Sequence, residues 1–249
     1  MVGVYLSIQR ILEIMAILDT LESEVNSILS INWNERNGTV IPETTDVALK
    51  DGAVKIEATF LYADLAGSSL LAKTCPWQTT AKIIRTYLDT AVRLIRHHNG
   101  EVRSFDGDRV MGIFKGDYPN TTAVTCARNI DWVVTNIINP KAKEKFKSIR
   151  DNDIKIRHCV GVDTSEARAV RSGIRNNNDL IWIGKAPAFA AKLSDIRDYP
   201  YEVYISKECY NKLAMSAKKN GTEDVWTAKD VVISGQTHTV YRSKTPLKP

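Results

Sequence analysis

Apolar residues recur every three or four positions in several long stretches of this chain, a spacing typical of one face of an α-helix. In residues 4–29 the repeat is broken only by Glu22 and consists of Val4, Ile8, Ile11, Met15, Leu18, Val25 and Leu29. The same spacing predicts helices over residues 77–98, 121–138, 188–196 and 206–217. We expect the helix over 121–138 to stop at Asn139-Pro140, because proline disfavours helical backbone at the residue before it.

The amphipathic N-terminal helix leaves two interpretations open. Its apolar stripe is long enough to form a heptad seam with a helix of a second subunit. The same stripe could instead lie on the helix's own domain. Residues 32–52 then lose all periodicity and contain the helix breakers Asn37-Gly38, Pro42 and Asp51-Gly52, so we expect a linker there. We therefore divide the chain into an N-terminal helix with its linker, residues 1–52, and a globular domain, residues 53–249.

Short runs of β-branched and aromatic residues predict the strands. The first run, residues 55–64, ends in Asp64. Residues 101–114 form a hairpin, because Asp106-Gly107-Asp108 separates two apolar-rich runs. Further strands are predicted over residues 154–162, 180–183, 202–205, 230–233 and 237–241. This order of strands and helices is typical of an α+β sandwich with a ferredoxin-like core.

Two carboxylates stand where predicted strands end. Asp64 closes the first strand, and the small residues after it can open a helix capped by Ser68 or Ser69, with free N–H groups for an anion. Asp108 lies in the bend of the hairpin, where Asp106 is a turn-forming residue first. Either motif alone is typical of a turn or a helix cap. Together they predict a site for hard divalent cations beside a phosphate cradle.

Composition narrows the class of protein. With 249 residues, 43% of them hydrophobic and 25% charged, the chain suits one sizeable domain plus an extension. The net charge of +5 suits a small polyanionic substrate, whereas no dense run of Lys and Arg indicates nucleic-acid binding.

Redox chemistry and membrane insertion are not indicated. The four cysteines are widely spread, without Cys-x-x-Cys spacing, and are Cys75, Cys126, Cys159 and Cys209. Neither a zinc site nor a disulfide framework is therefore expected. The apolar N-terminal stretch is interrupted by Gln9, Arg10 and Glu13, so it is neither a signal peptide nor a membrane-spanning helix. We expect a cytoplasmic protein.

The combined motifs resemble the catalytic domain of class III nucleotidyl cyclases. They are a strand ending in Asp64, a long helix, and Gly100-Glu101-Val102 leading to residues 107–114. Residues 62–69, YADLAGSS, and 103–114, RSFDGDRVMGIF, are similar more specifically to the pyrimidine cyclases of the Pycsar antiphage system. The resemblance covers about residues 55–243 and implies a cyclase that converts UTP to 3′,5′-cyclic UMP and pyrophosphate, with CTP as the alternative substrate. The product would be an antiphage second messenger that a separate effector protein detects.

The resemblance also implies a metal and phosphate half of the site. In this family two aspartates hold two divalent ions, Mg²⁺ or Mn²⁺, and Asp64 and Asp108 match them. Leu65 is assigned to the same metal site. The backbone after it would cradle the triphosphate, which makes the substrate-binding residues here Ala66, Gly67, Ser68 and Ser69.

The catalytic half departs from the family pattern. The family's ribose-binding asparagine falls on Ala188, and its transition-state arginine falls on Lys192, which keeps a positive charge and is assigned a catalytic role. A surface lysine is the alternative reading of Lys192, and a catalytically inactive, nucleotide-binding domain is the alternative function. In the family the two halves meet across a head-to-tail dimer, so a chain carrying both implies a homodimer with two equivalent sites.

The base-reading positions are also unusual. The two residues that read a purine in the family are Ser104 and Ile181 here, and neither suits adenine or guanine. Tyr62 is expected on the same strand face as Asp64, where it could narrow a base pocket, and Arg103 is a further substrate-binding candidate. The sequence leaves open whether His158 or Asp163 approaches the site.

Overall fold

Strand β2 (Gly52–Ala66) lies at the centre of a mixed sheet around which the chain is built. The computed structural model describes residues 8–249. The main path of the sheet, in spatial order, is β10 (Thr227–Ile233), β11 (Gln236–Ser243), β7 (Val203–Ser206), β5 (Arg157–Ile174), β2, β4 (Arg109–Phe114) and β3 (Glu101–Asp106). β2 pairs antiparallel with β4 on one side and β5 on the other, whereas β5 and β7 run parallel.

Both central strands are longer than the sequence pattern predicted. The strand expected to end at Val162 continues to Ile174, because residues 157–170 pair along the whole of β2. Its second half is rich in Ser, Thr, Ala and charged residues, which are weak strand formers, so the pairing with β2 sets its conformation. The outer part of β5 in turn pairs with β6 (Asn177–Ile183).

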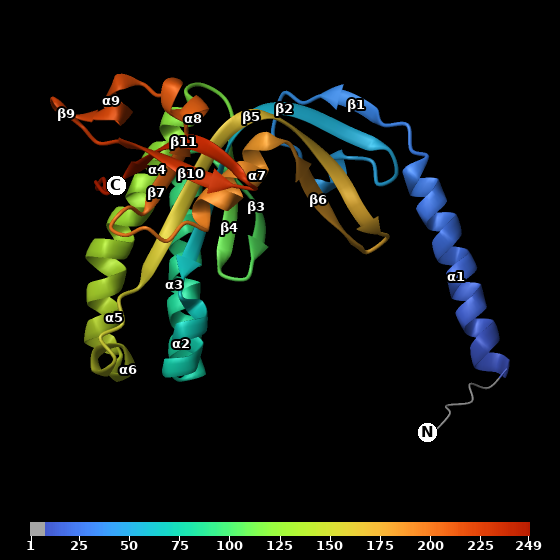
Figure 1. Cartoon of the computed structure of the whole chain (residues 1–249), viewed down its shortest axis with the longest axis horizontal. Helices are drawn as coiled ribbons and strands as arrows, with labels where there is room; N and C mark the ends of the chain where they lie inside the picture. The colour runs from blue at the N-terminus through green and yellow to red at the C-terminus, as the bar shows by residue number, and fades with distance from the viewer. Residues whose placement is uncertain (1–7) are drawn as a thin grey trace.

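The two faces of the sheet are covered by different helices. Alternate residues of β2 point to opposite faces: Leu61, Ala63 and Leu65 pack with α3 (Trp77–His97) and α4 (Pro119–Val133), which lie side by side in Figure 1. Residues of the other parity, such as Phe60, pack towards α7 (Lys185–Ser194). The predicted α+β sandwich is therefore confirmed.

Helix α7 approaches β5 so closely that one position must be glycine. A Cβ atom on Gly161 would lie 2.1 Å from the carbonyl oxygen of Ala190 and 2.5 Å from the nitrogen of Ser194. The sulfur of Cys159, two residues earlier on β5, donates to the carbonyl of Leu193 at 3.4 Å. The end of α7 is thereby fixed against the strand that runs beside the end of β2.

The predicted helix stop at Asn139-Pro140 is wrong. A π-helical turn, Val134–Ile138, follows α4, and α5 (Asn139–Lys145) begins at once with Pro140 in its first turn. Proline is tolerated in a first turn because its missing N–H has no helical partner there. The Asn139 amide donates to the carbonyls of Val134 and Ile156. A further short helix, α6 (Lys147–Asp151), leads to β5.

The helix predicted over residues 206–217 is shorter than expected. Ser206 does cap a helix, since its hydroxyl accepts from the Cys209 N–H at 3.0 Å, but α8 (Lys207–Asn211) ends after one turn. The Ala214 N–H instead donates to the Thr121 hydroxyl on α4. A hydrogen bond to another element thus takes the place of a hydrogen bond within the helix. The remaining elements of the C-terminal part are α9 (Met215–Lys218), β8 (Lys219–Asn220) and β9 (Glu223–Asp224). The predicted terminal hairpin is confirmed as β10 and β11.

The N-terminal part differs from the prediction in two ways: its linker contains regular secondary structure, and its helix does not pack on the domain. The linker contains β1 (Asn34–Asn37), which pairs with the start of β2, and a 3-10 turn at Thr44–Asp46. α1 (Ile8–Leu29) is confirmed as a helix, while the first four residues of the predicted range lie outside the described residues. It extends away from the domain (Figure 1), so the interpretation in which it lies on its own domain is wrong.

Two absences concern the part of the chain that the structure describes. No helix within residues 8–249 is long and apolar enough to cross a membrane. All four cysteines are free and buried.

Candidate active site

The end of β2 and the bend of the β3–β4 hairpin form one junction. Asp64 is paired in register with Arg109, and the backbone N–H of Leu65 donates to the carbonyl of Asp108 at 3.3 Å. Gly107 takes φ +60°, a left-handed conformation that suits glycine and makes the tight bend possible. The two predicted acids therefore lie next to each other, one on each side of this junction.

The Asp64 carboxylate is largely withdrawn from water, with 9% of the residue exposed. Burial raises its pKa, and the charge of Asp108 raises it further, while a hydrogen bond and the charge of Arg197 act in the opposite direction. A buried carboxylate needs a cation beside it. In this chain Arg197 supplies that charge by donating to Asp64.

Arg197 is held from behind by backbone. Its guanidinium also donates to the carbonyl of Ser194 at 2.6 Å and to that of Ile196 at 3.1 Å. Both carbonyls belong to the end of α7 and the segment after it. Because α7 is fixed against β5 at Gly161, the packing of a helix decides where this counter-charge lies.

Arg109 ties the hairpin to the same segment. It donates to Asp106 at 2.8 Å and to Asp195 at 3.2 Å. Its guanidinium carbon lies 5.7 Å from the centre of the Tyr62 ring. Asp106 is thus occupied by an ion pair within its own turn, in agreement with its prediction as a turn-forming residue.

A row of residues crosses three strands beside the acids. Tyr62 on β2 is opposite Met111 on β4, which is opposite Ser104 on β3. Directly opposed residues of antiparallel strands point to the same face, and Tyr62 shares that face with Asp64. Burial raises the pKa of the Tyr62 hydroxyl. The structure therefore brings Tyr62 and Ser104 together near the carboxylates, but Ile181 lies on β6, exposed.

The segment after Asp64 makes a tight turn into α2 (Ser68–Thr74). Gly67, at φ +76°, is the residue that caps this helix, and no side chain caps it, so the predicted capping by Ser68 or Ser69 is wrong. Glycine leaves the backbone N–H groups of the first turn uncovered by a side chain. Leu65 itself directs its side chain into the core.

A cavity of about 340 Å³ opens beside this turn. It is lined by Ala66 and Gly67 on one side and by three basic residues, Lys155, Arg157 and Arg197, on the other. Sequence reasoning missed all three. Nothing in their local sequence distinguishes them from surface basic residues, since only the fold brings them to the turn after Asp64.

Two predicted residues have other surroundings than expected. Lys192 is exposed on α7, and its side chain has no hydrogen bond or ion pair with another described residue. Arg103 sits where the β3–β4 register shifts, and donates to the carbonyls of Ile41 at 3.3 Å and Pro42 at 3.0 Å. Its guanidinium thus holds the linker against the hairpin. The substrate-binding assignment of Arg103 stays a prediction without a contact to support it.

His158 and Asp163 belong to separate buried groups. The His158 Nε2 lies 3.3 Å from an oxygen of Asp131 inside the core. Asp163 is fully buried; burial raises its pKa to about 6, although hydrogen bonds from Ser206 and the Thr164 N–H oppose this. Neither group contacts Asp64 or Asp108 directly.

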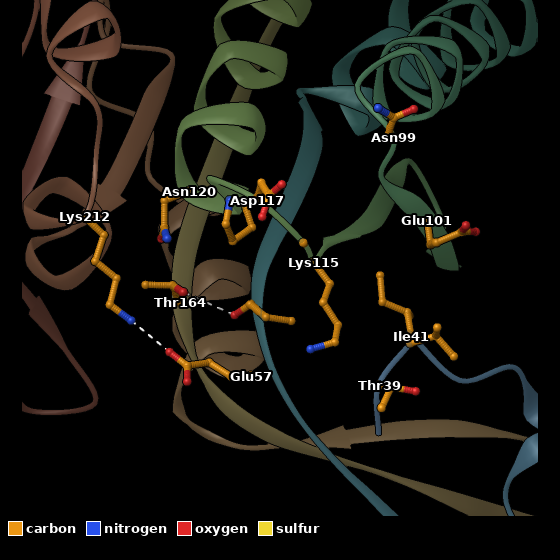
Figure 2. A pocket seen from close by; sticks show the side chains of 14 residues that line it. Thr39, Ile41, Glu57, Asn99, Glu101, Lys115, Asp117, Asn120, Thr164 and Lys212 are labelled. Carbon is orange, nitrogen blue, oxygen red and sulfur yellow. Dashed lines mark hydrogen bonds and ion pairs between the residues drawn. The ribbon is translucent and has the colours of Figure 1, made fainter. Parts of the chain in front are cut away.

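A second cavity, of about 760 Å³, is lined by Glu57 and Ala58 of β2 and by neither Asp64 nor Asp108. Figure 2 shows the side chains around it. Lys115 points into it, and Lys212 is paired with Glu57 at its edge at 3.0 Å. None of the predicted site residues lines it. Size alone would therefore favour a site away from Asp64 and Asp108.

The side chains at the junction that could bind a metal ion are a pair of carboxylates, Asp64 and Asp108. Among residues 8–249 no group of three or more His, Cys, Asp or Glu could hold a metal ion. The chemistry of Asp64, Asp108 and the backbone carbonyls around them is all oxygen, which fits Mg²⁺ or Mn²⁺. Phosphate oxygens of a substrate would have to complete the coordination.

Comparison with known proteins identifies the family, although no family model matches the chain. It is 43% identical over 237 residues to the uridylate cyclase of Rhodovulum sp. (strain MB263), which covers 94% of this chain and 99% of the relative. The chain belongs to the uridylate cyclase family. The uridylate cyclase of Burkholderia cepacia is 39% identical and covers 85% of this chain and 91% of the relative.

Solved structures of cyclases share the fold. The guanylyl cyclase Cya2 superimposes with a TM-score of 0.64 at 15% identity, covering 78% of this chain and 95% of its own. A bacterial light-regulated adenylyl cyclase gives 0.61 at 18% identity, covering 77% and 92%. At these identities the similarity establishes the class III cyclase fold of this uridylate cyclase family member.

Proposed function

We propose that this protein is a uridylate cyclase that converts UTP to 3′,5′-cyclic UMP and pyrophosphate. The observation that carries the proposal is the junction of Asp64 and Asp108, in a chain 43% identical to a uridylate cyclase over nearly its whole length. Adjacent carboxylates on a strand end and a hairpin bend suit a reaction centred on a phosphoryl group.

The reaction joins the ribose 3′-oxygen to the α-phosphorus and breaks the bond from that phosphorus to the bridging oxygen of pyrophosphate. Two divalent ions held by Asp64, Asp108 and the Leu65 backbone would lower the pKa of the 3′-hydroxyl and neutralise the α-phosphate. Because Asp64 is buried, few water molecules would compete with its carboxylate for binding to a metal ion. Asp106 takes no part, because Arg109 occupies it.

The basic cavity beside Gly67 would bind the β- and γ-phosphates of the substrate, which leave as pyrophosphate. Backbone N–H groups of Ala66 to Ser69 would approach the phosphates from the side of the cavity that Ala66 and Gly67 line. Lys155, Arg157 and Arg197 would approach them from the other side. Arg197 gives Asp64 its charge balance in the metal-free chain. Arg197 also lines this cavity, so with divalent cations at Asp64 its guanidinium would be available to contact a bound phosphate.

Base selection rests on Tyr62 and Ser104. A tyrosine ring narrows the space above the carboxylates, and a serine cannot make the contacts that a lysine or glutamate makes with a purine. Both residues lie in one row of the sheet. Lys192 would approach the substrate from a second subunit in a head-to-tail homodimer, because its side chain is exposed and has no ion pair within residues 8–249.

In the cell, the product would act as a second messenger of antiphage defence in the cytoplasm, detected by a separate effector protein. This part of the proposal rests on the resemblance to Pycsar pyrimidine cyclases. A chain whose mechanism ends at a small cyclic nucleotide needs a second protein to turn the product into a response.

The substrate is tested by incubating the purified full chain with UTP, CTP, ATP or GTP and Mn²⁺, with mass spectrometry of the products. We expect cyclic UMP from UTP. Cyclic CMP alone would favour the cytidylate alternative, and a cyclic product from ATP alone would overturn pyrimidine specificity.

The acids are tested in the same assay. Asp64→Asn and Asp108→Asn each remove a metal ligand, so we expect kcat/KM for UTP to fall by about 100-fold or more. Asp106→Asn is the matched control, because it changes a carboxylate in the same turn that Arg109 occupies, and its activity should stay within about threefold of wild type. Equal background turnover in all four proteins would instead favour the inactive, nucleotide-binding domain.

A further inference from the structure

The cavity drawn in Figure 2 contains polar groups that the proposed reaction does not use. It is lined by Ala58 of β2, by Thr164 of β5, by linker residues 39–41 and by the segment that joins β4 to α4. Its volume of about 760 Å³ lies in the range of pockets that bind small organic molecules. The cavity is thus large enough for more than a single ion.

Asn120 brings an unpaired amide to this cavity. The residue lies in the first turn of α4 and is 6% exposed, and its Oδ1 has no hydrogen-bond partner among residues 8–249. Figure 2 shows the amide directed towards Thr164. The Thr164 hydroxyl donates its proton to the carbonyl of Ala58 at 3.3 Å, so it offers Asn120 no donor. Because buried polar groups are normally hydrogen-bonded, this amide indicates a ligand that carries a donor.

Lys115 brings an unpaired positive charge. It is half-buried, points into the cavity (Figure 2) and has no ion pair within residues 8–249. Other charges of the lining are already paired: Lys212 with Glu57 at 3.0 Å, and Glu101 with Arg103 at 3.2 Å. Lys115 is therefore available to an anionic ligand.

The charges around Lys115 favour a ligand with a single negative charge. Three carboxylates line the cavity, those of Glu57, Glu101 and Asp117, and they would repel a triphosphate. The basic cavity beside Gly67 has three cations and no carboxylate in its lining, which suits a multiply charged group. The two cavities thus differ in the charge of the ligand that each can hold.

A cyclic nucleotide has the chemistry that the larger cavity lacks. Its phosphodiester carries one negative charge, the complement of Lys115. Its uracil has an imide N–H beside a carbonyl, and the Asn120 amide has an acceptor beside a donor, so the two can pair through two hydrogen bonds.

We propose that this cavity is a second nucleotide site, which binds cyclic UMP with its phosphate at Lys115 and its uracil at Asn120. The choice of cyclic UMP rests on the proposed function, because it is the singly charged nucleotide that the reaction would release. Since residues 39–41 line the same cavity, the bound nucleotide would contact the linker and the central sheet at once.

Isothermal titration of the full chain with cyclic UMP in EDTA tests the proposal, because the catalytic junction then lacks its metal ions. We expect saturable binding of one nucleotide per chain. Lys115→Met removes the free charge and Asn120→Leu removes the amide at similar volume, and each should weaken binding about tenfold or more. Lys82→Met is the matched control, because Lys82 is exposed on α3 and lines neither cavity. It should bind cyclic UMP as the wild type does.

Hydrogen exchange of the wild type locates the bound nucleotide. We expect slower amide exchange in residues 39–41 and 115–120, and no change in residues 64–69. Arg197→Gln separates the two cavities, because a nucleotide held in the basic cavity would lose a contact. This variant should bind cyclic UMP as tightly as the wild type. Should Asn120→Leu fail to fold, Lys115→Met, hydrogen exchange and Arg197→Gln still decide the result.

Absence of binding overturns the proposal, as does binding that Lys115→Met leaves intact or protection confined to residues 64–69. Displacement of cyclic UMP by an equal concentration of inorganic phosphate would also overturn it, since the site would then select an anion alone. Cyclic UMP is supplied ready-made, so the result does not depend on synthesis by the chain. An active cyclase without this binding contradicts only this proposal, whereas a chain that binds cyclic UMP here but makes none contradicts only the proposed function.

Discussion

At the scale of single residues, the main feature of the candidate site is the buried negative charge of Asp64, which a neighbouring cation has to neutralise. Asp64 is buried beside Asp108, and both features raise its pKa, so that the carboxylate needs a cation. Arg197 provides one from the far side of α7. Because Arg197 neutralises Asp64, the site can remain folded when no metal ion is bound. Arg197 then also competes with a metal ion for the Asp64 carboxylate.

Replacing Arg197 should therefore separate metal binding from substrate binding. In Arg197→Gln we expect Mn²⁺ to bind the nucleotide-free protein more tightly at pH 8, because its competitor at Asp64 is gone. The KM for UTP should rise about tenfold, the effect of losing one charge-assisted hydrogen bond to phosphate. Calorimetry of Mn²⁺ binding and steady-state kinetics measure the two effects.

Arg85→Gln is the matched control for that experiment, since Arg85 is an exposed arginine paired only with Asp89 on α3. It should change neither quantity. Weaker Mn²⁺ binding by Arg197→Gln at pH 8 would show that the arginine supports the metal site rather than competing for it.

Asp163 gives a second residue-scale prediction, on stability. Its pKa is raised from 3.8 to about 6 in the folded chain, chiefly by burial, so between those pH values the folded state holds a proton that the unfolded state has lost. The contribution of Asp163 to the free energy of unfolding therefore falls as the pH rises from about 4 to about 6.

Asp163→Asn removes this pH dependence. Compared with wild type, the variant should be more stable at pH 8, by up to about 3 kcal/mol, and the advantage should shrink at pH 4.5. Thermal unfolding followed by circular dichroism at both pH values measures it. An advantage of the same size at both would mean that the carboxylate does not titrate in this range.

At the scale of secondary-structure elements, the contact between α7 and β5 positions the site. α7 ends in the segment that carries Asp195 and Arg197, and both reach the hairpin or the end of β2. The helix can lie this close because Gly161 has no side chain. Gly161 is paired with Tyr62 on β2, two residues before Asp64. A change at this glycine should therefore displace, through α7, two charges of the site.

Gly161→Ala tests this coupling. The new methyl group would lie 2.1 Å from a backbone oxygen of α7, an overpacking that we expect to cost about 1–3 kcal/mol of unfolding free energy and to lower kcat for UTP. Urea denaturation and kinetics provide the readouts. Lys185→Arg, exposed on the same helix, is the control and should leave both unchanged. Normal stability with normal activity in Gly161→Ala would show that α7 can move away without consequence.

At the scale of the whole molecule, the proposal divides each site between two chains. Asp64 and Asp108 would act with Lys192 of a second subunit, so each half can be inactivated separately. Restoration of activity by mixing two inactive chains is a property that a site contained in one chain cannot show.

Co-expression of Asp64→Asn with Lys192→Ala tests this arrangement. Each variant alone should be inactive, while random pairing makes half of the dimers mixed, each with one intact site of two, and so restores about a quarter of wild-type activity. Differently tagged chains and tandem purification isolate the mixed dimer. Full activity of Lys192→Ala by itself, or no recovery in the mixed dimer, would exclude the shared site.

Short-range patterns in the sequence were sufficient to predict the hairpin, the positions of the two acids on it and on the first strand, and most of the helices. A turn of Asp106-Gly107-Asp108 between apolar runs specifies a hairpin wherever it occurs, and a strand that ends in Asp64 fixes where that carboxylate lies. Helical periodicity likewise gave α1, α3 and α4. These features depend on neighbours within a few positions along the chain, which is why the sequence by itself determines them.

Only the tertiary structure decided the rest. Arg197 is 133 positions from Asp64 in the chain and reaches it because α7 packs on β5. The second half of β5 is a strand because β2 lies beside it, and the helix continues through Asn139-Pro140 because a π-turn changes its register. Contacts of this kind have no local pattern, since their energy comes from residues that are distant in sequence and adjacent only after folding.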